Sequence, residues 1–192
     1  MPVINYNVSW MIYNSFLALL AVGFGYFIFE VENKILRIFF GLVWFLFLPN
    51  TIYIFTDLMH LIEQWGYTQG SVRLLLVLQY TIFELVGIVT FLLAFFPFEN
   101  IVSRIRGFKK NKTVLYIIFN FIIAFGMVLG RVERINSWDI FTNPHIVLVS
   151  GLHVFTSINL IGLTVLFGLI CNFIYFLFRD KLLVIKLRKH LH

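Results

Sequence analysis

The chain has 192 residues, of which 60% are apolar and 12% are charged, and its mean hydropathy is +0.93. Soluble domains are about half apolar and a quarter charged, so this composition excludes a soluble globular protein and indicates a membrane protein. The formal charge is +6. Because the basic residues flank apolar runs, they indicate orientation in a bilayer and not a nucleic-acid partner. The single cysteine, Cys171, excludes an intrachain disulfide.

Five apolar runs are long enough to cross a hydrocarbon core of about 30 Å, which takes about 20 helical residues. They cover residues 10–29, 38–56, 74–98, 113–129 and 155–178. The alternating polar pattern of barrel strands is absent. We therefore predict an all-α integral membrane bundle of about five transmembrane helices, forming a single transmembrane domain over residues 1–192.

The stretch from His145 to Phe178 is too long for one span. We expect a break near Ser150–Gly151, with residues 145–152 forming a short helix that is interfacial or partly re-entrant.

The basic residues of the loop 98–113 and of the tail after residue 178 predict the orientation. Positive loops stay in the cytoplasm, and two spans separate these segments, so one topology satisfies both. We therefore expect the N-terminus outside, the C-terminus inside and a multi-pass protein of the cytoplasmic membrane.

The first polar motif is FLPNTIYIFTDLMHL, residues 47–61. Pro49 removes a backbone donor, so Pro49–Asn50 predicts a kink in the second span, which either borders a cavity or only assists packing. Asp57, His60 and Glu63 follow at three-residue spacing, which places them on one helix face at the outer end of the span. They are candidate metal ligands, or else a solvated and salt-bridged helix end.

The second polar motif is GRVERINSWDIFTNP, residues 130–144. Arg131 and Arg134 are three residues apart, so on a helix they share a face and could bind a phosphate or carboxylate. Asn136, Trp138 and Asp139 follow directly. Trp138 could equally be an interfacial anchor, and the arginines could be paired within the protein. We expect both motifs to lie on the outer side and to share one polar site.

Glu84 falls near the middle of the third span. An ionised carboxylate at that depth costs several kcal/mol, so it is normally paired, protonated or facing water. One reading is an acid that binds a ligand or a proton. The other is a structural ion pair or hydrogen bond, with Arg131 as the best-placed cation.

In the two motifs the sequence resembles a bacterial membrane-protein family known as domain-of-unknown-function family 1361. The resemblance rests on the LPN step at 48–50, on Asp57 and His60, and on the R-x-NSWD step at 134–139. It extends from the first helix to about Pro144 and is weak beyond it. The resemblance implies the fold and the motif boundaries, but no reaction, substrate or cofactor.

We predict a multi-pass protein with an outward-facing polar pocket that binds an anionic lipid or envelope ligand, or a subunit of a membrane complex. Its partners are then membrane lipid and possibly another membrane protein. One alternative is a membrane enzyme that is metal-assisted, and another is a transporter component. The candidate ligand-binding residues are Asn50, Asp57, His60, Glu84, Arg131, Arg134, Asn136, Trp138 and Asp139. No motif identifies a cofactor.

Overall fold

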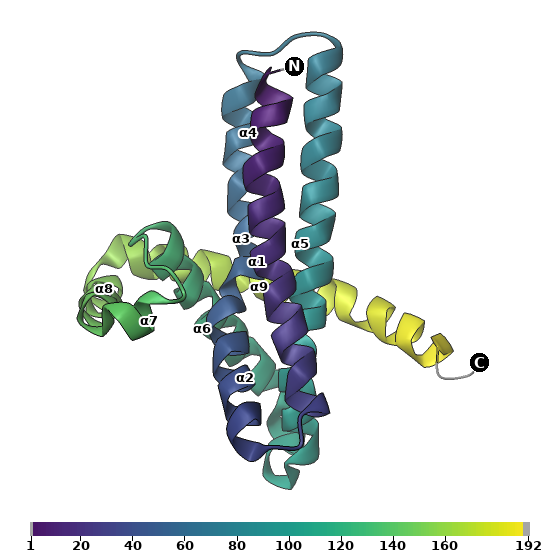
Figure 1. Cartoon of the computed structure of the whole chain (residues 1–192), viewed down its shortest axis with the longest axis vertical. Helices are drawn as coiled ribbons and strands as arrows, with labels where there is room; N and C mark the ends of the chain where they lie inside the picture. Colours follow the sequence, from purple (N-terminus) through teal and green to yellow (C-terminus); the bar gives the residue numbers. More distant parts are fainter. Residues whose placement is uncertain (1, 190–192) are drawn as a thin grey trace. The chain divides into compact units, whose positions relative to one another are not determined.

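The computed structural model describes residues 2–189, and these residues fold into α-helices joined by short turns (Figure 1). Five helical stretches are long and apolar enough to cross a membrane: Val3–Glu30, Lys34–Trp65, Ser71–Arg104, Lys112–Arg131 and Ile158–Asp180. The predicted all-α class and the five spans are therefore confirmed. The first four helices extend beyond the predicted runs, because helix formation continues into the flanking polar residues.

The chain divides into two compact units, residues 1–94 and 95–192, and each is described by itself. The boundary falls within the long helix α5, Ser71–Arg104. The expected single domain and the expected orientation of the termini stay predictions.

Unit 1 contains α1 (Pro2–Glu30), α2 (Lys34–Phe47), α3 (Pro49–Tyr53), a 3-10 turn η1 (Ile54–Asp57), α4 (Leu58–Trp65) and the first part of α5. The helix α1 packs along α2 and α3, and Figure 1 shows α1, α4 and this part of α5 running side by side. Apolar side chains from α1, η1 and α5 form the core between them: Met11, Ala18, Ile54, Leu76, Tyr80 and Phe83. This packing positions the polar residues of the same three segments.

The second span is interrupted where the sequence predicts a kink. The helix α2 ends at Phe47, α3 begins at Pro49, and η1 follows before α4. Asn50 Nδ2 donates to the Phe47 carbonyl at 3.1 Å, and Thr51 Oγ1 donates to the Leu48 carbonyl at 2.7 Å. Polar side chains thus satisfy carbonyl groups at the interruption. The predicted interruption is confirmed, and Asn50 has a structural role in it.

Unit 2 contains the rest of α5, a 3-10 turn η2 (Arg106–Asn111), α6 (Lys112–Arg131), α7 (Asp139–Thr142), α8 (Pro144–Thr156) and α9 (Ile158–Lys189). The helices α6 and α9 pack along each other, and α8 contacts both. Rings from α5, α6 and α9 form an aromatic cluster that includes Phe95, Phe98, Tyr116, Phe119 and Tyr175. Inside the span, Asn120 Nδ2 donates to Asn172 Oδ1 at 3.0 Å, which links α6 to α9.

The break predicted near Ser150–Gly151 is wrong. The helix α8 continues through both residues, and the chain becomes extended only at Ser157, with φ −94° and ψ 114°. Ser150 is buried, and Gly151 lies opposite the ring of Phe125, so packing keeps this glycine helical. The short helix is therefore Pro144–Thr156, and the last span begins at Ile158.

Candidate functional site

Three buried or half-buried amides join α1, α4 and α5 at the end of unit 1 that carries Trp65. We call Asn7, Gln64 and Gln79 the amide cluster. Asn7 Nδ2 donates to Gln64 Oε1 at 2.7 Å, and Gln64 Nε2 donates back to Asn7 Oδ1 at 2.9 Å. Asn7 Nδ2 also lies 3.3 Å from Gln79 Oε1, and Gln79 Nε2 donates to the Ile4 carbonyl. These amides satisfy one another, so they fix the three helices together.

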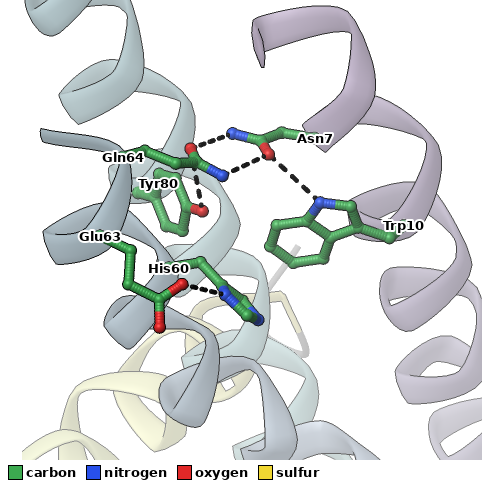
Figure 2. Close-up of polar contacts among 6 residues, drawn as sticks. All are labelled: Asn7, Trp10, His60, Glu63, Gln64 and Tyr80. Atoms are coloured by element: carbon green, nitrogen blue, oxygen red, sulfur yellow. Dashed lines mark hydrogen bonds and ion pairs between the residues drawn. The ribbon is translucent and has the colours of Figure 1, made fainter. Parts of the chain in front are cut away.

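Figure 2 shows Asn7 and Gln64 of the amide cluster with four neighbouring side chains. Trp10 Nε1 donates to Asn7 Oδ1 at 3.2 Å, and the hydroxyl of Tyr80 lies 3.5 Å from Gln64 Oε1. The rings of Trp10 and His60 pack edge to face, with their centroids 5.7 Å apart. His60 Nδ1 lies 3.2 Å from Glu63 Oε2, and these two side chains are 41% and 66% exposed. His60 and Glu63 therefore form an accessible rim beside a closed polar network.

A second polar layer lies deeper in unit 1. Asp57 is only 1% exposed, and Asn14 Nδ2 donates to its Oδ2 atom at 3.1 Å. Glu84 on α5 interacts electrostatically with Asp57. Both carboxylate oxygens of Glu84 are buried, and no residue within 2–189 donates a hydrogen bond to them. The pairing expected between Glu84 and Arg131 would join the two units, and it stays a prediction.

The predicted place of Asp57 at the outer end of its span stays a prediction, but Asp57 is not at the end of the helical stretch Lys34–Trp65. The helix α4 continues for eight residues beyond it, which is about 12 Å of helix. The sequence hides this continuation because polar residues interrupt the apolar run after Thr56.

The structure does not assemble the predicted metal ligands. Asp57 accepts a hydrogen bond from Asn14, while His60 pairs with Glu63. Among the described residues, no group of three or more His, Cys, Asp or Glu side chains is placed to hold a metal ion. A metal-assisted reaction at Asp57, His60 and Glu63 therefore has no geometric support.

In unit 2, the second motif begins where α6 ends. Helical hydrogen bonding continues to the N–H of Val132, and Ile135 N–H donates to the Leu129 carbonyl at 3.1 Å. Arg134 lies between them with φ 57°, in the left-handed region that side chains other than glycine rarely occupy. Arg131 is the last helical residue and Arg134 is outside the helix. The prediction that both arginines share a helix face is therefore wrong.

The rest of the second motif is a hydrogen-bonded turn. Asp139 Oδ2 accepts from the backbone N–H of Asn136 at 2.7 Å and from its Nδ2 atom at 3.2 Å. Trp138 is 45% exposed. Asn136 and Asp139 thus have a structural role that accounts for their spacing, while Trp138 is accessible.

Several polar residues of this structure are missing from the sequence-based site. Asn7 and Asn14 are one heptad apart and so share a face of α1, which is a signal that could have identified them. His153 Nδ1 lies 2.9 Å from Glu133 Oε1 in unit 2. Arg179 Nε lies 3.0 Å from Glu99 Oε1, and the Tyr175 hydroxyl donates to the same oxygen. Opposite charges near the ends of two spans were the only sequence signal for this pair.

Fold and site together define a five-helix membrane protein with polar groups inside unit 1. The chain belongs to the family described as "Protein of unknown function (DUF1361)", whose model matches residues 13–174. The match contains both motifs and Glu84, and it reaches well beyond Pro144, where the resemblance was expected to fade. No curated protein and no solved structure matches the chain.

Proposed function

We propose that this protein is a membrane-embedded binding protein, or the binding subunit of a membrane complex, for a ligand of the membrane or cell envelope. The observation that carries the proposal is the pair of arginines where α6 ends, with Arg131 in its last turn and Arg134 exposed just beyond it. The accessible rim of His60 and Glu63 beside the closed amide cluster offers a second surface. Because the cluster fixes α1, α4 and α5, the rim side chains are held on a rigid support. Rigid support lowers the entropy lost when a ligand binds.

The chemistry of each unit favours a different group on the ligand. In unit 1, the rim offers a carboxylate, an imidazole and the ring of Trp10, which suit an ammonium or hydroxyl group. In unit 2, Arg131 and Arg134 favour the anionic lipid or envelope ligand expected from the sequence, since guanidinium groups bind phosphate well. Anion binding at Arg131 and Arg134 is the primary proposal.

A transporter component is the second candidate. Glu84 supports it, because a carboxyl group without a hydrogen-bond partner inside a span is typical of ion pathways. No observation on the described residues favours the enzyme alternative.

Thermal unfolding in detergent with added lipid tests the proposal. A ligand that binds only the folded protein raises its unfolding temperature, and the increase grows with the ratio of ligand concentration to Kd. Phosphatidylglycerol should stabilise the protein more than phosphatidylcholine does, and Arg131→Gln or Arg134→Gln should remove the difference. Glu63→Gln is the matched control and should keep it.

Selective stabilisation by phosphatidylethanolamine that Glu63→Gln abolishes would instead assign binding to the rim of unit 1. Equal stabilisation by all three lipids, in wild type and variants alike, would refute a specific headgroup site.

A further inference from the structure

Glu84 is the one titratable side chain of the described residues whose two buried carboxylate oxygens both have no hydrogen-bond partner. More than nine in ten buried polar groups in proteins do have a partner. The residue lies in α5, within a stretch apolar enough to span a membrane. An ionised carboxylate there costs several kcal/mol unless something compensates it. Glu84 therefore needs a proton, a cation or a donor group.

The surroundings of Glu84 are built around the broken second span. Asp57 ends η1, the 3-10 turn of that span, and Asn14 of α1 holds its carboxylate. One turn after Glu84, Gly87 brings α5 against the same turn: a Cβ atom there would lie 3.0 Å from Ile54 Cβ. Broken membrane helices commonly border ligand and ion sites. The close approach at Gly87 thus fixes Glu84 beside the break.

The charged and titratable groups of unit 1 near Glu84 define what it can bind. Asp57 on η1 is the charged group that acts on it, and α1 contributes the neutral Asn14 at this level. Tyr80 lies one turn earlier on α5, and His60 and Glu63 of α4 form the rim. A second negative charge beside Asp57 would be repelled. A proton on one of the two acids removes this repulsion and also adds a donor, because a protonated carboxyl group can donate a hydrogen bond.

We propose that Glu84 is an intramembrane proton-binding site. Its carboxylate takes up one proton from water to form an O–H bond, and gives the same proton back on release. The polar side chains of the same helices continue from Glu84 toward the end of α4 that carries Trp65. Asn14 and Asp57 come first, then His60 of the rim, and then the amide cluster, about 10 Å farther along α1 than Asn14. This inference goes beyond headgroup binding, and either can fail without the other.

A hydrophobic carbodiimide, dicyclohexylcarbodiimide, tests the proposal on the whole purified protein. The reagent adds the O–H of a protonated carboxylic acid across one of its C=N bonds, and rearrangement leaves a stable N-acylurea. Mass spectrometry should locate this adduct on Glu84, and labelling should fall as the pH rises. Glu84→Gln should lose the adduct, and Asp57→Asn should shift the pH at which labelling falls. Glu30→Gln, at an exposed position at the end of α1, is the matched control and should be labelled like wild type.

Locating the adduct in the wild-type protein tests the proposal even if Glu84→Gln does not fold. Absence of an adduct on Glu84 at every pH, or labelling that does not change with pH, would overturn the proposal. Protection by sodium ions at constant pH, where potassium ions do not protect, would also overturn it, because the site would then bind a cation.

Discussion

Two glutamates on the same helix have opposite surroundings. Glu99 lies in unit 2, 3.0 Å from Arg179 Nε, and it accepts a hydrogen bond from Tyr175. The Arg179 guanidinium also lies over the rings of Tyr116 and Tyr175, at 5.1 and 5.5 Å. Glu84 lies in unit 1, and its buried oxygens accept no hydrogen bond from the described residues. The same residue type thus serves as a fully compensated structural group in one unit and as an uncompensated one in the other.

This difference distinguishes carboxyl groups that stabilise the fold from those that are available for a proton or a ligand. A carboxylate with a cation, a phenol and aromatic rings around it gains little from a ligand, and its loss leaves a cation in apolar surroundings. A carboxyl group without such partners weakens the fold when ionised, and it is available for a proton or a ligand. Substitution of each glutamate by its neutral isostere should therefore affect stability to very different extents.

The largest expected effect is that of Glu99→Gln. It should destabilise the protein by about 3 kcal/mol, because Arg179 loses its counter-charge in a site where both side chains are mostly buried. Glu84→Gln should change stability by less than about 1 kcal/mol. Unfolding by dodecyl sulfate in mixed micelles measures both.

The double variant Glu99→Gln with Arg179→Gln provides the control. It should recover part of the loss, since neither charge is then left alone. If Glu84→Gln destabilised the protein as much as Glu99→Gln, Glu84 would be a structural residue and the contrast between the two units would be wrong.

Helix contacts in unit 2 should also be less tolerant than those in unit 1. A Cβ atom on Gly168 of α9 would lie 2.1 Å from Phe121 Cδ1 of α6, so Gly168→Ala requires the ring to move. We expect a loss of about 2 kcal/mol in the same unfolding assay. On the same helix, Gly162 has no described heavy atom within 4 Å of such a Cβ, so Gly162→Ala should be neutral or slightly stabilising.

In unit 1 the corresponding position is Gly87, where the nearest atoms to an added Cβ are Ile54 Cβ and Cγ2 at 3.0 Å. Gly87→Ala should cost about 1 kcal/mol, which is less than Gly168→Ala because the required shift is smaller. Gly23 on α1 has open space among the described residues and is the control. If Gly87→Ala lost more stability than Gly168→Ala, the helix contact in unit 1 would be the less tolerant of the two, contrary to this prediction.

The sequence was sufficient for the features that depend on composition and local chemistry. Apolar runs predicted five helices, and Pro49 predicted the interruption of the second span. The sequence did not predict the features for which packing overrides the local conformational preference of the backbone. Gly151 stays helical against Phe125, and α4 carries the second span past Asp57.

In the candidate site, too, the sequence predicted features that depend on local pattern and missed features that depend on packing. Helical spacing suggested that Arg131 and Arg134 share a face, but the left-handed backbone at Arg134 ends the helix between them. The depth of Glu84 could be estimated by counting residues along its span. Its lack of a hydrogen-bond partner depends on side chains from other helices, which no local pattern in the sequence specifies.

The smallest expected effect concerns two left-handed residues, one in each unit. Unit 1 places Gly70 at φ 56°, where glycine has no steric penalty, whereas unit 2 places Arg134 at φ 57°. Gly70→Ala should therefore cost about 1 kcal/mol. Arg134→Gly should stabilise the protein by roughly 0.5 kcal/mol, because relief of the strained backbone exceeds the extra entropy of glycine in the unfolded chain. Arg134→Ala keeps the strain, so it should not be stabilising, and the difference between the two variants isolates the backbone contribution. If Arg134 binds an anionic headgroup, Arg134→Gly should be more stable than wild type in detergent alone and yet lose its stabilisation by phosphatidylglycerol. A variant that gained stability and kept the lipid effect would show that the arginine side chain is not needed for binding.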